Sequence, residues 1–264
     1  MAASAFACGP SLLDSEAVAD HPGIRDLSAI VLVGGLGTRL GPVAGGLPKP
    51  MVPVAGRPFL EHLVRWLARS GVGRVVLAVG HRAGSVEAHF GDGAKFGVHV
   101  AYSCEAEPLG TGGALRQAAQ SLGRWPILGL NGDSFAAVDI HAMLASHAAR
   151  GARVTVALTE VPQGDRFGRV RLGRDDAILG FAEKSSGGPG LVSAGVYLLE
   201  RDAVGMIPPG RSSLEHETLP RLAGHGAYGF VTRGFFVDIG VPADYQRLEG
   251  APERFLRAME GGLE

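Results

Sequence analysis

The fold is decided by the stretch AIVLVGGLGTRLGPVAGGLPKP at residues 29–50. Its first five residues, 29–33, form an apolar and largely β-branched run, which is typical of a buried strand in a parallel sheet. Residues 34–37 follow at once and contain three glycines. A loop without Cβ atoms lets backbone N–H groups come close to a bulky anion. The stretch therefore predicts a phosphate-binding loop at the end of a buried strand.

Two cations follow this glycine loop. Arg39 offers a planar fork of donors for phosphate oxygens, and Lys49 offers a compact charge between Pro48 and Pro50. The loop is not a dinucleotide fingerprint, because Leu40 stands where the third glycine belongs. It is not a P-loop either, since no Lys with Ser or Thr comes directly after the last glycine. Loop, arginine and lysine together predict a clamp for a triphosphate.

Length and composition predict one α/β domain. The chain has 264 residues, 46% of them hydrophobic, and a formal net charge of −1, so neither nucleic acid nor an anionic membrane is an expected partner. Cys8 and Cys104 are far apart and fit no metal-ligand spacing, which favours reduced thiols in a cytoplasmic protein. No run of about 18 apolar residues is present. Residues 1–26 begin without Lys or Arg and are expected to form a mobile extension rather than a signal peptide.

The first half of the chain alternates between two periodicities. Strands are predicted over 29–33, 74–79, 98–102 and 125–130, and helices over 57–69, 85–90, 112–121 and 138–149. This alternation predicts an α/β, Rossmann-like, mainly parallel sheet with helices on both faces. Ligands of such sheets bind beyond the carboxyl ends of the strands. The glycine loop and Asp133 both follow strand ends, so we expect them to meet in one cleft.

The second half has shorter extended runs, separated by turns rich in Gly and Asp. They lie at 154–158, 168–172, 177–181 and 191–199 and predict a small, partly antiparallel β-rich lobe. Residues 243–259 are predicted to be helical, with a break at Pro252. The expected organisation is an extension over 1–26 and a domain over 27–264, divided into 27–150, 151–242 and a closing segment at 243–264.

Two aspartates from distant parts of the chain lie next to apolar runs. Asp133 follows the strand in LNGDS, and Asp238 interrupts the run FFVDIG. An aspartate at a strand end can simply cap a helix or a turn. A charge inside an apolar run is costly unless it is paired or binds a metal, and carboxylates are the ligands that Mg²⁺ prefers. We therefore predict that Asp133 and Asp238 hold one Mg²⁺ ion.

The string GGxGTRL at 34–40, followed by PKP at 48–50, resembles the nucleotidyltransferases that activate sugar 1-phosphates. The strings PLGTGGA at 108–114, LNGD at 130–133 and FFVDIGVP at 235–242 are most similar to the D-glycero-D-manno-heptose 1-phosphate guanylyltransferases, and next to the mannose 1-phosphate enzymes. The resemblance covers roughly residues 28–248. It implies transfer of a nucleotidyl group from GTP to a sugar 1-phosphate with release of pyrophosphate, for polysaccharide or glycoconjugate biosynthesis. It also leaves a homo-oligomer open.

The resemblance implies a role for each motif. Catalysis is assigned to Arg39, Lys49 and Asp133. Nucleotide binding is assigned to Val33, Gly34, Gly35, Gly37, Thr38, Glu105, Leu109, Gly110 and Thr111. Sugar-phosphate binding, in the half at 151–242 and at the end of the fourth strand, is assigned to Asn131, Glu183, Lys184, Ser193 and Gly195. In this family the lysine of the Glu-Lys pair meets the sugar phosphate, and the glutamate meets sugar hydroxyls.

The base and the sugar are less closely defined than the reaction. Residues 105–110 are expected along the nucleobase edge, where the carboxylate of Glu105 can accept from both N1–H and N2–H of guanine. The alternative is that Glu105 is a solvated loop residue. Residues 41–46 lack the Pro-Leu-Thr of the wider superfamily, so another sugar or NTP stays open. Two other classes are a non-catalytic sugar-nucleotide sensor and an NAD-dependent oxidoreductase, which the intact motif residues and the missing third glycine disfavour.

Overall fold

The centre of the fold is a set of four parallel strands. The computed structural model describes residues 23–34, 46–80, 83–162, 168–182 and 188–261. In spatial order the parallel strands are β6 (Ile127–Asn131), β1 (Ser28–Leu32), β4 (Arg74–Val79) and β5 (His99–Cys104). The sequence prediction of a mainly parallel sheet is confirmed, because all four strands lie close to their predicted positions.

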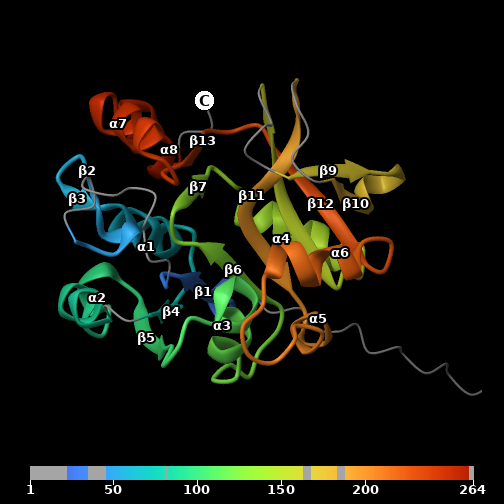
Figure 1. The fold of residues 1–264 in the computed structure, drawn as a ribbon, viewed down its shortest axis with the longest axis horizontal. Helices are drawn as coiled ribbons and strands as arrows, with labels where there is room; N and C mark the ends of the chain where they lie inside the picture. The colour runs from blue at the N-terminus through green and yellow to red at the C-terminus, as the bar shows by residue number, and fades with distance from the viewer. Residues whose placement is uncertain (1–22, 35–45, 81–82, 163–167, 183–187, 262–264) are drawn as a thin grey trace, which may run out of the picture.

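Helices cover both faces of this sheet. They are α1 (Phe59–Arg69), α2 (Ala83–Phe90), α3 (Gly110–Ala119) and α4 (Ile140–Ala149). Successive side chains of a strand point to opposite faces, so alternate side chains of β1 pack in two separate hydrophobic cores. Ala29 and Val31 pack in the core that includes α1, whereas Ile30 packs in the core that includes α3. Figure 1 shows α1 and α3 on the two sides of β1. The strand is buried on both faces, as its apolar run predicted.

A β-rich lobe continues the same sheet (Figure 1). Its strands are β8 (Val154–Val161), β9 (Arg169–Leu172), β10 (Ile178–Ala182), β11 (Gly190–Leu199) and β12 (Ala227–Thr232). Strand β11 runs antiparallel to β6 and so joins the lobe to the parallel half. Strand β8 is antiparallel to β11 and parallel to β12. The partly antiparallel lobe was predicted, whereas β12 was not, because Ala227–Thr232 is short and contains a glycine that weakens the strand pattern.

Two short ribbons stand apart from the main sheet. Strands β7 (Ser134–Ala136) and β13 (Phe236–Asp238) are antiparallel, with Ser134 opposite Asp238. This pairing brings together segments that lie about a hundred residues apart in the chain. The second ribbon is formed by β2 (Pro53–Val54) and β3 (Arg57–Pro58). Neither ribbon was predicted, because two or three residues carry no readable periodicity.

The chain closes with two helices, α7 (Pro242–Gly250) and α8 (Glu253–Met259), broken before Pro252 as predicted. The ring of Phe255 stacks on Phe59 of α1 with centroids 5.6 Å apart, and the Tyr245 hydroxyl donates to the carbonyl oxygen of Pro53 at 2.7 Å. These contacts fix the closing helices beside α1 (Figure 1). The remaining elements are α5 (Arg201–Gly205), α6 (Leu219–Leu222), the 3₁₀ turns η1 (Ile24–Asp26), η3 (Lys49–Met51), η4 (Ala94–Phe96) and η5 (Arg174–Asp176), and a π-helical turn η6 (Leu214–Thr218). Across the described ranges, no helix has the length and apolar character needed to cross a membrane.

Candidate active site

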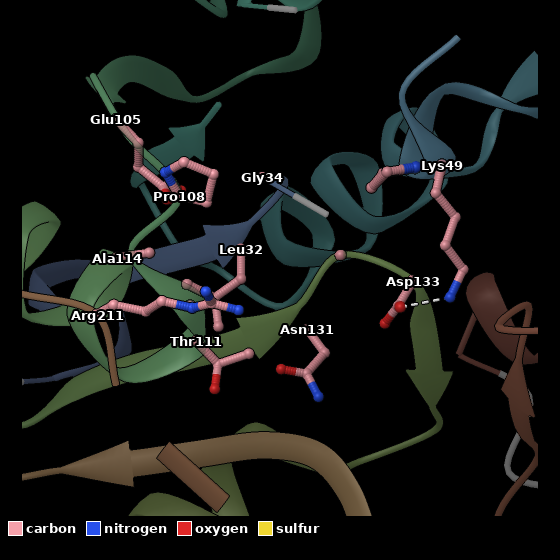
Figure 2. Close-up of a pocket in the computed structure, with 13 residues that line it drawn as sticks. Leu32, Gly34, Lys49, Glu105, Pro108, Thr111, Ala114, Asn131, Asp133 and Arg211 are labelled. Carbon is pink, nitrogen blue, oxygen red and sulfur yellow. Dashed lines mark hydrogen bonds and ion pairs between the residues drawn. The ribbon is translucent and has the colours of Figure 1, made fainter. Parts of the chain in front are cut away.

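A cleft lies where the strand order of the sheet reverses. After β1 the chain builds β4 and β5 on one side, then returns through α3 to place β6 on the other side of β1. Sheets of this kind bind ligands outside the carboxyl ends of the strands at that reversal. A cleft of about 320 Å³ is present there, between the ends of β1 and β6 (Figure 2). The predicted residues that line it are Gly34, Lys49, Glu105, Gly110, Thr111, Asn131 and Asp133.

Other predicted residues lie beside the cleft or cannot be placed. Val33, Leu109, Ser193, Gly195 and Asp238 are described but do not line it. Gly35, Gly37, Thr38, Arg39, Glu183 and Lys184 lie outside the described residues. Most of the glycine loop and the Glu-Lys pair therefore stay sequence predictions.

One end of the cleft holds a lysine between two carboxylates. The Nζ atom of Lys49 lies 2.5 Å from Oδ2 of Asp133 and 4.0 Å from Oδ1 of Asp238. Asp133 follows β6, and its carbonyl oxygen accepts from the backbone N–H of Ile239 at 2.9 Å. Oδ1 of Asp238 also accepts from the N–H of Gly240 at 2.6 Å. The β7–β13 ribbon thus assembles the two predicted metal ligands around the predicted catalytic lysine.

The opposite end of the cleft holds Glu105. Its Oε2 atom accepts a hydrogen bond from the backbone N–H of Leu109 at 2.8 Å, which closes the turn before α3. Burial raises the pKa of this carboxyl, against the opposing effect of the Leu109 hydrogen bond. A Cβ built on Gly34 would lie 2.4 Å from Oε1 of Glu105, so a larger residue there would displace this carboxylate. Figure 2 shows Glu105 and Pro108 on one side of the cleft and Lys49 on the other.

The end of β6 meets β11 at a second close approach. Gly195 has φ = 76°, and a Cβ there would lie 2.6 Å from Oγ of Ser134 and 3.0 Å from Nδ2 of Asn131. Glycine at this position leaves room for the Asn131 side chain, which lines the cleft. Ser193 is near, because its hydroxyl bonds Tyr197 at 3.1 Å and its Oγ accepts weakly from the N–H of Gly195 at 3.3 Å. The structure brings three of the predicted sugar-phosphate residues together here.

Two charged residues of this site were not predicted from the sequence. Arg211 lines the cleft together with Leu32 and Thr111, and Figure 2 draws these three side chains. Glu215, in the π-helical turn η6, accepts from the Thr111 hydroxyl at 2.7 Å. Both lie in a connection with no periodic pattern, so sequence reasoning found no element there. The available signal was the pair of opposite charges flanking the short run Ser212–Leu214.

A doubly wound α/β sheet with a cleft at its strand reversal is the architecture of many nucleotide-binding proteins. The chain belongs to the nucleotidyl transferase family, whose model matches residues 28–251. This match confirms the resemblance deduced from the glycine loop and the PKP string.

Proteins similar to this chain in sequence include guanylyltransferases. The chain is 38% identical over 228 residues to a mannose-1-phosphate guanylyltransferase of Mycobacterium tuberculosis, covering 84% of this chain but only 64% of that protein. It is 33% identical to a D-glycero-alpha-D-manno-heptose 1-phosphate guanylyltransferase of Aneurinibacillus thermoaerophilus, covering 87% of this chain and all of that protein. The crystal structure of HddC from Yersinia pseudotuberculosis complexed with GMP-PN superimposes with a TM-score of 0.76 at 32% identity, covering 87% of this chain and 99% of that one.

Proposed function

We propose that this protein transfers the guanylyl group of GTP to a sugar 1-phosphate, D-glycero-D-manno-heptose 1-phosphate, and releases pyrophosphate. The observation that carries the proposal is the cleft at the β1–β6 reversal, which has a half-buried carboxylate suited to a guanine at one end and a lysine with two aspartates at the other. A relative of the same length as the matched region is named for this reaction, and HddC is crystallised with a guanine nucleotide analogue.

The chemistry needs positioning and charge neutralisation rather than a covalent intermediate. An oxygen of the sugar 1-phosphate attacks the α-phosphorus of GTP in line, the bond from that phosphorus to the β-phosphate oxygen breaks, and pyrophosphate leaves with the electron pair. Lys49 is placed to meet negative charge at one end of the cleft. Arg39 would join it on the triphosphate, Lys184 would hold the attacking phosphate, and Glu183 would bind sugar hydroxyls. Arg211 adds a further cation on the cleft wall.

The aspartates suit a Mg²⁺ ion. Both carboxylates lie within 4.0 Å of the same ammonium, so they converge on one cationic position, and hard oxygen donors are what Mg²⁺ selects. In the described part of the chain no cluster of three or more His, Cys, Asp or Glu side chains could hold a metal. Magnesium commonly takes only one or two carboxylates and completes its shell with water and substrate phosphates, so Asp133 and Asp238 fit it. The ion would neutralise phosphate charge between the two substrates.

The base would be read by Glu105. Its Oε2 is engaged by Leu109, and the second carboxylate oxygen lies against Gly34 at the end of β1, on the lining of the cleft. An ionised carboxylate there can accept from the adjacent N1–H and N2–H of guanine. Adenine has no N1–H, so ATP would leave a partly desolvated acceptor without its donors. We therefore expect a preference for GTP.

Pyrophosphate release across a grid of substrates tests this function. GTP, ATP, UTP and dTTP are each combined with heptose 1-phosphate, mannose 1-phosphate and glucose 1-phosphate, and the Asp133→Asn variant serves as the matched inactive enzyme. The highest kcat/KM is expected for GTP with heptose 1-phosphate. Mannose 1-phosphate is the second candidate, because the mycobacterial relative is named for it. Binding of GDP-sugar without turnover of any pair would contradict the proposal and favour a non-catalytic sensor.

The cellular compartment and the oligomeric state belong to the same proposal. Cys104 is a free and exposed thiol, which supports a reducing, cytoplasmic setting. A homo-oligomer is compatible with the family, and light scattering of the purified chain measures it. GTP and the sugar 1-phosphate are the expected partners.

A further inference from the structure

Glu215 is the meeting point of side chains from three elements of the cleft. Its Oε2 atom accepts from the hydroxyl of Thr111, at the start of α3, at 2.7 Å. Its Oε1 atom accepts from the hydroxyl of Tyr197 in β11 at 3.1 Å and from Nδ2 of Asn131 at the end of β6 at 3.5 Å. One carboxylate of η6 therefore connects α3, β6 and β11.

The Thr111 hydroxyl makes two hydrogen bonds to the η6 region, one as donor and one as acceptor. While its hydroxyl donates to Glu215, Oγ1 of Thr111 accepts from the backbone N–H of Leu214 at 2.9 Å. The backbone N–H of Gly112 donates to the carbonyl oxygen of Ser212 at 3.0 Å in the same region. The start of α3 is thus held to the η6 turn by side chain and backbone together, and the rotation of the Thr111 hydroxyl is determined by the carboxylate.

The contact with Tyr197 extends to two predicted sugar-phosphate residues. Tyr197 is fully buried, so its hydroxyl needs a partner inside the protein. The Ser193 hydroxyl donates to the oxygen of Tyr197 at 3.1 Å, and Oγ of Ser193 accepts from the N–H of Gly195 at 3.3 Å. The direction of these bonds is set by Glu215, because an ionised carboxylate can only accept.

The orientation of the Asn131 amide follows from the same rule. An amide next to a carboxylate turns its NH₂ group toward it and its oxygen away. In the described structure Nδ2 of Asn131 faces Glu215, and the buried Oδ1 atom of Asn131 has no hydrogen-bond partner there. A buried acceptor without a partner is costly, and a ligand donor in the cleft that Asn131 lines would relieve the cost.

We propose that Glu215 is a positioning residue that couples the nucleotide side of the cleft, through Thr111, to the sugar side, through Asn131 and Tyr197. The inference rests on the proposed transferase function. Glu215 acts by fixing the donors and acceptors that other residues present, and it does not line the cleft itself. Its removal releases the Thr111 hydroxyl, the Asn131 amide and the Tyr197–Ser193 pair at once.

Steady-state kinetics of Glu215→Ala and Glu215→Gln test the coupling. The alanine variant is expected to lower kcat/KM at least about tenfold for GTP and for the sugar 1-phosphate alike, since it removes charge-assisted bonds to both sides. Glutamine keeps the side-chain size but only one acceptor oxygen, so its loss is expected to be smaller than that of the alanine variant. Glu217→Gln is the matched control, because Glu217 is exposed in the same turn and accepts from the backbone N–H of Ser213; its kinetics are expected to equal those of the wild type.

Tyr197→Phe tests the sugar side of the cleft separately from the nucleotide side. It removes one hydroxyl, keeps the buried ring, and leaves the Thr111–Glu215 bond intact. We expect it to raise KM for the sugar 1-phosphate and to leave KM for GTP within about twofold. Thermal unfolding and calorimetric titration with GTP are measured on every variant, so that each rate is taken from fully folded protein.

Two results would overturn the inference. One is a Glu215→Ala variant with a lowered Tm but wild-type kcat/KM for both substrates, which would make the carboxylate purely structural. The other is a Glu215→Ala variant whose kcat/KM falls for only one of the two substrates. A wild-type chain that turns over no substrate pair would instead refute the transferase proposal. In that case, calorimetric titration of Glu215→Ala with GTP would still test whether Glu215 supports nucleotide binding.

Discussion

Lys49 forms an ion pair with Asp133, with Nζ 2.5 Å from Oδ2, and its side chain is only 12% exposed. Oδ1 of Asp238 lies 4.0 Å from the same Nζ atom. The lysine therefore neutralises two carboxylates that would otherwise repel each other in a partly buried position. The same cation would become available for phosphate if a metal ion bound the two carboxylates. Lysine and metal are thus expected to compete for Asp133 and Asp238 in the free enzyme.

This competition predicts two opposite effects of Lys49→Ala. The kcat is expected to fall by about 10²-fold or more, because a cation is lost from the charge that develops on the triphosphate. The affinity of the free enzyme for Mn²⁺, used as a paramagnetic probe for Mg²⁺, is expected to rise. Lys95→Ala is the control, since Lys95 lies over the ring of Phe96 and does not line the cleft. Unchanged Mn²⁺ affinity in Lys49→Ala would argue against the competition.

The carboxylates themselves are tested by amide substitution. Asp133→Asn and Asp238→Asn keep size and shape but remove the charges that would hold Mg²⁺, so each is expected to lower kcat by about 10²-fold or more. Asp202→Asn, at an exposed ion pair with Arg153, is the control for loss of a surface carboxylate. Pyrophosphate release is measured with Mg²⁺ and with excess EDTA. Equal activity in both conditions would refute the metal assignment.

The base preference is tested at Glu105. Glu105→Gln replaces one acceptor oxygen by a donor and is expected to lower the ratio of kcat/KM for GTP to that for ATP by about 10-fold to 100-fold, equivalent to about 1–3 kcal/mol. Glu107→Gln, an exposed carboxylate of the same loop, should leave the ratio unchanged. A GTP preference that survives Glu105→Gln would show that another group reads the base.

The raised pKa of Glu105 makes this preference depend on pH. Burial shifts the pKa of the carboxyl above its ordinary value, so its neutral form accumulates as the pH falls through that raised pKa. A neutral carboxyl is a poorer acceptor for two guanine donors. The GTP-to-ATP ratio is therefore expected to decline on acidification at a higher pH than an exposed glutamate would titrate, and to be flat with pH in Glu105→Gln. Since kcat/KM reports the free enzyme, its pH profile is the measurement.

The two lysines of the motifs are expected to serve different substrates. Lys184→Ala is expected to raise KM for the sugar 1-phosphate about tenfold while changing KM for GTP little, whereas Lys49→Ala mainly lowers kcat. Lys95→Ala again serves as the control for loss of a lysine. Initial rates with each substrate varied at saturation of the other give both KM values. Sugar-phosphate kinetics identical to the wild type would make Lys184 a surface residue.

Local sequence determined most of the fold because its elements are periodic and repeated. The apolar run at 29–33 reads as a strand buried on both faces, and β1 is one, with alternate residues in two cores. The order of strands and helices then implied the parallel sheet and a cleft at the strand ends. Gly34, Lys49, Glu105 and Asp133 could be singled out because each stands next to a strand end or inside a short motif, where spacing carries information.

Tertiary structure alone decided how distant segments meet. Asp133 and Asp238 are brought together by the β7–β13 ribbon, whose three-residue strands are too short to show a period. Glu215 gains its role only because the η6 turn packs against α3, β6 and β11, and no local pattern around it predicts those contacts. Hydrogen-bond networks of this kind are long-range and directional. The partners of a carboxylate depend on which distant segments of the chain pack against it. The burial of a strand, in contrast, can be predicted from the local pattern of its own side chains.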